Sequence, residues 1–239
     1  MVATALYPVP MRLRPLAELV GIALLTAALL STQSVSETVG GGWAEKLLLP
    51  ARMALLILVC TWLLRRGGER WADLGLRMPA TLWKVPLLML GGYALIGATV
   101  TALTVLVLPA LGAPRPDMSA FQALRGDKAE YLYWLIPVAL GSAAVGEELL
   151  MRGFVLNRFA RLLGHAGGAP YAAIVAQAAL FGVLHAYQGI GGVLTTFAVG
   201  LGIGLVYRWG GANLWACILL HGLIDAVTMT AFYLGRVPA

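Results

Sequence analysis

The sequence predicts an all-α fold: a polytopic transmembrane helix bundle of about seven spans that forms a single membrane domain over residues 1–239. Hydrophobic residues make up 60% of the chain and charged residues only 12%, whereas an average soluble domain is about 25% charged. The apolar residues gather in seven stretches, each close to the roughly 20 residues that an α-helix needs to cross a bilayer. The segments between them are short, so we expect no separate soluble domain.

Glycine-rich and polar segments set the limits of each span. Runs such as Gly40-Gly41-Gly42 and Gly210-Gly211-Ala212-Asn213 are typical of turns. The first stretch resembles a secretory signal, but no small-x-small cleavage site follows it, so we interpret it as a span. The predicted spans are approximately residues 16–34, 47–64, 85–111, 132–152, 170–187, 190–207 and 214–234.

Two local patterns refine this order of spans. Between residues 153 and 163, apolar side chains and the arginines Arg158 and Arg161 lie on opposite faces of a predicted helix, which lies flat at the interface or prolongs the fourth span. In the sixth span, Gly200 and Gly204 form a Gly-x-x-x-Gly step. This step predicts close packing against a neighbouring helix.

The basic residues predict the topology. A net charge of +6 would suggest nucleic acid as the partner of a soluble protein, but here the basic side chains gather in alternate loops, as the positive-inside rule describes. The inner group is Arg12, Arg14, Arg65, Arg66, Arg70, Arg77, Lys84, Arg158, Arg161 and Arg208, and the outer group is Lys46, Arg115, Arg125, Lys128 and Arg236. We therefore expect a multi-pass protein of a bacterial plasma membrane, with a cytoplasmic N-terminus, the lipid bilayer as a partner and no bound nucleic acid.

Three of the predicted spans carry polar groups that lipid penalises. They are Glu147-Glu148-Leu149-Leu150-Met151-Arg152, Phe181-Gly182-Val183-Leu184-His185 and His221-Gly222-Leu223-Ile224-Asp225. A charge near the bilayer centre costs roughly 2.5 to 3.5 kcal/mol, so the two glutamates, the arginine and the aspartate would together cost on the order of 10 kcal/mol if they were unpaired. These groups therefore need partners or a function within the protein.

Helix geometry separates the two adjacent glutamates. Successive residues turn by about 100° around a helix axis, so Arg152 lies about 40° from Glu148 and about 140° from Glu147. Glu148 and Arg152 can form an ion pair at i,i+4 spacing that supports the site. Glu147 points to a different face and has no local partner, so it is the carboxylate that is free to act as a general base toward water.

The histidines supply a second kind of chemistry. His221 and Asp225 share one helix face, and His185 closes the fifth span. Imidazole is the side chain best suited to shuttle protons or to hold water near neutral pH. Structural interpretations stay open at this point: an intramembrane ion pair for Glu148 and Arg152, and a solvated helix end for His185.

Taken together, the three segments resemble the motifs of the CPBP family of intramembrane proteases, which includes the type II CAAX prenyl endopeptidases. The resemblance covers about residues 130–235, whereas residues 1–129, with the first three spans, match only in being hydrophobic. It implies an all-helical membrane enzyme that hydrolyses a peptide bond in a membrane-embedded or lipid-anchored protein.

The same resemblance implies a role for each polar residue. Glu147 and His185 would position and activate the attacking water, and His221 and Asp225 would stabilise the oxyanion. The aspartate departs from the family pattern, where asparagine is common, and an ionised aspartate cannot donate a hydrogen bond to an oxyanion. Asp225 is therefore expected to be protonated, to orient His221, or to serve another purpose.

This mechanism needs no cofactor, but a metal-dependent alternative stays open. Two histidines and a carboxylate with an open position form a known catalytic zinc set. The ligands of a divalent metal such as zinc would be Glu147, His185 and His221.

The predicted span limits place Glu147 near the cytoplasmic end of the fourth helix and His185 near the outer end of the fifth, roughly a membrane thickness apart. For the two side chains to meet, the fourth helix must continue through residues 153–163, and the fifth must be short, tilted or displaced. Broken helices are tolerated in a membrane where they line a cavity.

Two other functions compete with peptide hydrolysis. The carboxylates and histidines could form the relay of a proton-coupled transporter or channel, although we find no inverted repeat in the two halves of the chain. The protein could also be a non-catalytic membrane scaffold or a self-immunity factor that binds other membrane proteins.

Overall fold

The computed structural model describes residues 13–30, 42–164 and 166–237, and within these ranges every regular element is a helix. Six of the helices are long and apolar enough to cross a membrane, and a shorter apolar helix, α8, accompanies them. The predicted all-α bundle of a multi-pass membrane protein is confirmed in the described part of the chain. The main helices are α1 (Leu13–Leu30), α3 (Trp43–Arg66), α4 (Lys84–Ala102), α8 (Ala169–Leu184), α9 (Gly189–Trp209) and α10 (Leu214–Tyr233).

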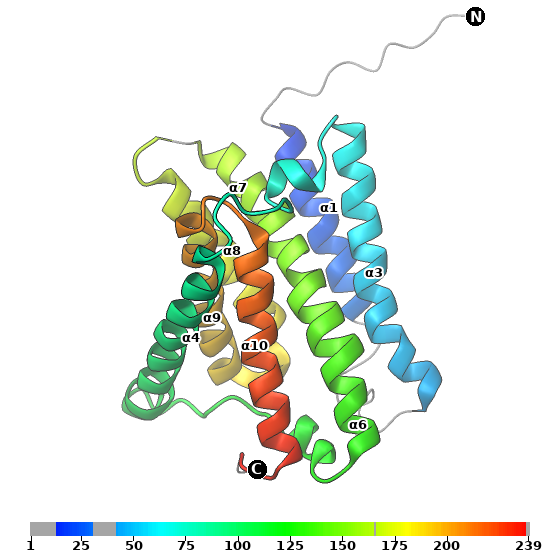
Figure 1. The fold of residues 1–239 in the computed structure, drawn as a ribbon, viewed down its shortest axis with the longest axis vertical. Coiled ribbons are helices and arrows are strands. Elements are labelled where there is room, and N and C mark those ends of the chain that lie inside the picture. The colour runs from blue at the N-terminus through cyan, green and yellow to red at the C-terminus, as the bar shows by residue number, and fades with distance from the viewer. Residues whose placement is uncertain (1–12, 31–41, 165, 238–239) are drawn as a thin grey trace, which may run out of the picture.

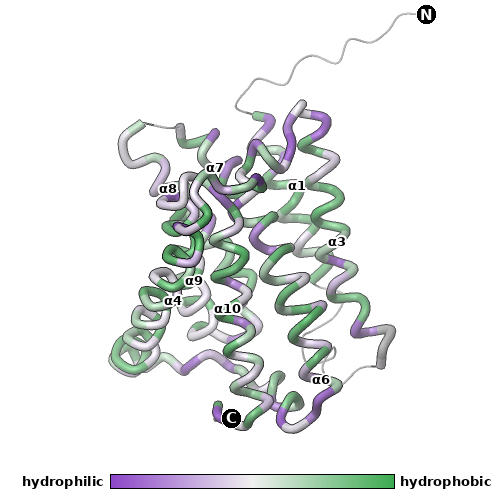
Figure 2. Tube along the Cα trace, in the orientation of Figure 1, coloured by the Kyte–Doolittle hydropathy of each residue, from purple (hydrophilic) through white to green (hydrophobic). Residues whose placement is uncertain are grey.

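The helices run up and down along the long axis of the molecule (Figure 1). The beginning of α1 lies at the same end of the bundle as α7 (Leu156–Leu163), and α10 ends at the opposite end, near α6 (Lys128–Tyr133). Hydrophilic residues gather at both ends, and the middle of the bundle is mostly hydrophobic (Figure 2). This distribution is the one that a bilayer imposes on the proteins that cross it.

Shorter elements connect or prolong these helices. A π-helical turn and a short helix continue α4, and single 3₁₀ turns occur in the loops. The continuing segments are Leu103–Val107 and α5 (Leu108–Ala110), and the 3₁₀ turns are Trp71–Leu74, Ser119–Leu124 and Ala186–Gln188.

The fourth span is much longer than its predicted range of residues 132–152. Residues Lys128–Leu163 form one continuous 36-residue helix, here called the long helix, in which α6 and α7 flank the π-helical segments Trp134–Glu147 and Leu149–Val155. The predicted end at residue 152 is therefore wrong, and the amphipathic segment that follows prolongs the span. It does so because its polar side chains find partners inside the protein, as described below.

The fifth span is short, as the meeting of the polar residues required. Helix α8 has 16 residues and ends at Leu184, and the chain then turns through Ala186–Gln188 into α9. Gly189 has a φ of +74° at this turn, a backbone conformation that glycine adopts at little cost. The early end of α8 places His185 at a helix terminus.

The glycines of α9 pack against two neighbouring helices. A Cβ atom on Gly200 would lie 3.1 Å from the Cα of Ala178, and one on Gly204 would lie 2.7 Å from the side chain of Ile174, both in α8. A Cβ atom on Gly202 would lie 2.4 Å from Ile96 in α4. The predicted packing role of the Gly-x-x-x-Gly step is therefore confirmed.

Candidate active site

The three polar segments of the sequence meet around the ring of Phe181. The guanidinium carbon of Arg152, on the long helix, lies 4.9 Å from the centroid of this ring. The ring of His185, just after α8, and the ring of His221, on α10, lie 4.9 Å and 6.3 Å from the Phe181 ring, centroid to centroid. Three helices thus bring together residues that are far apart in the sequence.

Glu148 is the central acceptor of this cluster. Its side chain is 0% exposed, and its Oε1 accepts hydrogen bonds from Nη1 of Arg152 and from Nδ1 of His221, each at 2.7 Å. The predicted ion pair with Arg152 is therefore present, and it is fully buried. Arg152 also donates from Nη2 to the backbone carbonyl of Gly200, at 3.2 Å. Glu148 and Arg152 consequently join the long helix to α9 and α10.

His221 lies between two carboxyl groups. Its Nδ1 contacts Glu148, and its Nε2 lies 3.5 Å from Oδ2 of Asp225, one turn further along α10. The His221 side chain is only 7% exposed, whereas that of Asp225 is 21% exposed. The Nε2 side of the imidazole is therefore the side nearer to the more accessible part of the site.

Glu147 is placed differently from Glu148. It is partly exposed, and within the described residues it makes no hydrogen bond or ion pair. Its charge nevertheless acts on both His221 and Asp225, so the three groups lie within electrostatic range of one another. Among the described residues, Glu147 is thus a partly exposed carboxylate with no hydrogen-bond or ion-pair partner, within electrostatic range of the buried polar cluster.

His185 has one ring nitrogen engaged by the backbone. Its Nδ1 lies 2.9 Å from the carbonyl oxygen of Phe181, and a carbonyl can only accept, so Nδ1–H is the donor. In the neutral ring Nε2 is then unprotonated and can accept a proton or a hydrogen bond from water. The partly buried His185 is therefore held in the tautomer that suits a water-positioning residue.

The described residues do not gather Glu147, His185 and His221 into a metal-binding group. Across residues 13–30, 42–164 and 166–237, no group of three or more His, Cys, Asp or Glu side chains is disposed to hold a metal ion. In addition, Nδ1 of His221 is engaged by Glu148, and its Nε2 faces Asp225. We therefore derive no step through a metal held by Glu147, His185 and His221.

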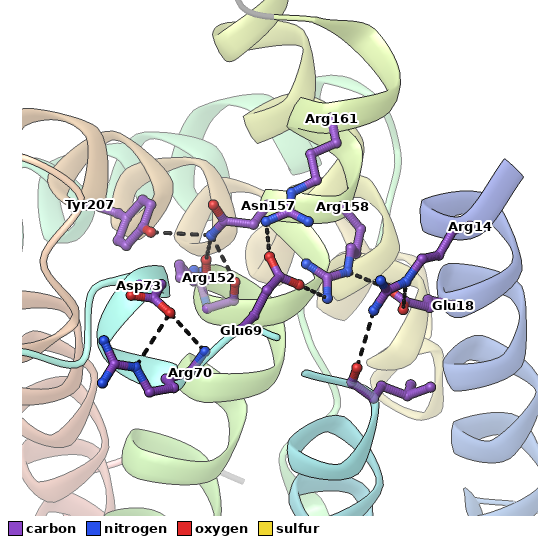
Figure 3. Close-up of polar contacts among 12 residues, drawn as sticks. Arg14, Glu18, Glu69, Arg70, Asp73, Arg152, Asn157, Arg158, Arg161 and Tyr207 are labelled. Atoms are coloured by element: carbon purple, nitrogen blue, oxygen red, sulfur yellow. Dashed lines mark hydrogen bonds and ion pairs between the residues drawn. The ribbon is translucent and has the colours of Figure 1, made fainter. Parts of the chain in front are cut away.

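A second buried charge cluster lies at the end of the bundle where α1 begins (Figure 3). Arg158 of α7 is 0% exposed and donates to Oε2 of Glu18 in α1 at 2.5 Å and to Oε2 of Glu69 at 2.7 Å. Arg14 binds the other oxygen of Glu18, and Arg161 binds the other oxygen of Glu69. This network ties α1 and the loop after α3 to the helix that carries Glu147 and Glu148.

Replacement of Arg158 by methionine is expected to destabilise the protein by about 3 kcal/mol, because it leaves two largely buried carboxylates without their shared partner. Arg161→Met is the matched control, since the Arg161 side chain is 43% exposed, and exposed pairs contribute about 0–1 kcal/mol. Both variants can be measured by reversible unfolding in detergent micelles. Equal losses of unfolding free energy in the two variants would contradict the role assigned to Arg158.

The sequence analysis did not identify two features of the site. The Gly200 carbonyl that accepts from Arg152 belongs to a residue that we assigned to helix packing alone. Tyr187 lies two residues after His185, and the centroids of their rings are 5.8 Å apart. Its place next to a motif histidine, just past a helix end, is the signal that could have identified it.

Comparison with known proteins agrees with the motif pattern. A family model described as Type II CAAX prenyl endopeptidase Rce1-like matches residues 129–227, nearly the range over which the motifs were expected to extend. The match supports the assignment to the CPBP family and, at the family level, an intramembrane endopeptidase of the CAAX type. Searches of curated proteins and of solved structures give no match.

Proposed function

We propose, on the premise that residues 129–227 are the CPBP-family segment of this chain, that the protein hydrolyses a peptide bond in a membrane-embedded or lipid-anchored protein, with a water molecule activated by Glu147. The observation that supports this most strongly is the meeting of all three motif segments around Phe181. A scaffold does not require a carboxylate that lacks a partner among the described residues or an imidazole held in one tautomer, whereas hydrolysis uses both.

In the proposed reaction, Glu147 and Nε2 of His185 hold the attacking water. Glu147 takes one proton as the oxygen of this water bonds to the carbonyl carbon, and the carbonyl oxygen becomes an oxyanion. Collapse of this intermediate breaks the C–N bond, and the proton on Glu147 passes to the leaving amine. The products are an amine and a carboxylic acid, which gives up the remaining water proton to become a carboxylate, and the glutamate returns to its starting state.

His221 is the proposed donor to the oxyanion. Its Nδ1 is hydrogen bonded to Glu148, so the donor to a substrate would be Nε2, which also faces Asp225 at 3.5 Å. The carboxyl group of Asp225, 3.5 Å from this nitrogen, favours a proton on it and so keeps the donor in place. Asp225 thus acts by holding His221 and not by donating to the oxyanion.

Glu148 and Arg152 are proposed to hold this arrangement together. Both side chains are 0% exposed and connect to each other, so they cannot take part in proton transfer with a substrate in the accessible part of the site. Their hydrogen bonds to His221 and Gly200 instead fix the relative positions of the helices.

Hydrolysis can be tested directly with purified protein in liposomes that contain membrane-anchored reporter peptides. When the reaction is run in water labelled with ¹⁸O, cleavage is expected to place one labelled oxygen in the new C-terminal carboxylate of the peptide, as mass spectrometry would detect. Intact peptides together with a pH-dependent ion flux across the liposome membrane would contradict the proposal and favour a transporter.

A further inference from the structure

Tyr187 lies at the accessible edge of the candidate site. It follows His185 by two residues, and the two rings lie 5.8 Å apart at an interplanar angle of 33°. The charges of Glu147 and Asp225 both act on its hydroxyl group, so this group lies within electrostatic range of both carboxylates. The phenol therefore lies beside His185 and within electrostatic range of Glu147 and Asp225, three residues to which the proposed mechanism assigns a role.

The hydroxyl proton of Tyr187 is free to be donated. Nε2 of the buried Gln188 lies 3.4 Å from the Tyr187 hydroxyl oxygen, and an amide nitrogen can only donate. The tyrosine oxygen is consequently the acceptor in this contact. Its own O–H can then donate to another group, such as an oxygen atom of a substrate.

The proposed oxyanion site would benefit from a second hydrogen-bond donor. Stabilisation of a tetrahedral intermediate commonly uses more than one hydrogen-bond donor, and His221 offers only Nε2 because Nδ1 is bonded to Glu148. The position one turn later holds Asp225, whose carboxylate cannot donate, whereas an asparagine amide could. One donor is therefore lacking from this side of the site.

We propose that Tyr187 is a catalytic residue whose hydroxyl group donates a hydrogen bond to the oxyanion, in place of the amide that Asp225 lacks. This inference rests on the proposed peptide hydrolysis and names a further residue of the same site. It predicts that Tyr187 acts in the transition state more than in substrate binding.

Tyr187→Phe removes the hydroxyl group and leaves the ring. Loss of one oxyanion donor is expected to lower kcat by about 10²-fold, with KM changed by no more than about threefold, because the donor binds charge that develops only in the transition state. Tyr171→Phe is the matched control: Tyr171 is 49% exposed at the start of α8, and Tyr187 is 51% exposed just beyond its end. The control is expected to retain the wild-type kcat.

The Asp225→Asn background separates a catalytic role from a structural one. An asparagine there restores an amide donor, so Tyr187→Phe is expected to cost no more than about tenfold in kcat in this background, compared with about 10²-fold in the wild type. A merely structural tyrosine would show the same loss in both backgrounds. Three results would overturn the proposal: an equal loss of kcat in both backgrounds, an unchanged kcat in Tyr187→Phe, or an effect of Tyr187→Phe confined to KM.

The same assay distinguishes this failure from failure of the proposed function. If the wild type cleaves the reporter peptide and Glu147→Gln does not, a wild-type kcat in Tyr187→Phe refutes only the role of the tyrosine. If the wild type does not cleave the peptide, or if Glu147→Gln still does, the hydrolytic mechanism is refuted and the role of Tyr187 falls with it.

Discussion

Glu147→Gln is expected to reduce kcat by about 10³- to 10⁴-fold, the upper part of the range for loss of a general base. Glutamine has nearly the same shape as glutamate but cannot take a proton from water. Because Glu147 makes no hydrogen bond or ion pair within the described residues, the substitution removes no stabilising contact that the structure contains. The unfolding free energy should therefore stay within about 0.5 kcal/mol of the wild type.

The experiment measures initial rates of peptide cleavage and detergent unfolding on the same preparations. Glu45→Gln provides the control, because Glu45 is an exposed carboxylate in the first turn of α3, and its kcat is expected to equal that of the wild type. Turnover that persists at the wild-type rate in Glu147→Gln would rule out this residue as the base. A large loss of stability in the same variant would show that Glu147 has a structural role instead.

Arg152→Met is expected to cost about 4–5 kcal/mol of unfolding free energy, the upper part of the range for breaking a buried ion pair. Both Arg152 and Glu148 are 0% exposed, so the substitution leaves a buried carboxylate without its charged partner. It also removes the hydrogen bond to Gly200 that joins the long helix to α9. Cleavage activity should fall as well, because His221 is held through Glu148.

The double variant Glu148→Gln/Arg152→Met tests this explanation. It removes both charges, so no unpaired buried charge is left, and it should recover more than half of the stability lost in Arg152→Met. The control is Arg70→Met, because the ion pair of Arg70 with Asp73 is at the surface and is expected to contribute less than about 1 kcal/mol. A double variant that is as unstable as Arg152→Met would show that charge pairing is not the cause.

Most of the bundle could be predicted from the sequence, because a bilayer demands apolar helices of a certain length and polar turns between them. The predicted limits of six spans agree with the helices to within about four residues, except for the predicted end of the first span at residue 34, which lies outside the described residues. The fourth span was the exception. Its amphipathic continuation carries Arg158, and hydropathy alone could not show that this arginine is buried between Glu18 and Glu69.

The local pairing within one helix was also predictable. Glu148 and Arg152 are four residues apart, and the ion pair between them follows from helix geometry. The requirement that the polar segments meet led to the expectation of a prolonged fourth helix and a short fifth helix, and both are present.

The apolar content of the chain, the lengths of its helices and the residue types of its three motifs all follow from the amino-acid order, since each depends on neighbours within a few turns of one helix. The contact of Glu148 with His221, 73 positions away, does not follow from the amino-acid order. Neither does the use of the Gly200 carbonyl by Arg152, 48 positions away. Such contacts depend on how far each helix is rotated and displaced relative to its neighbours, and that is set by packing among side chains that are distant in the sequence.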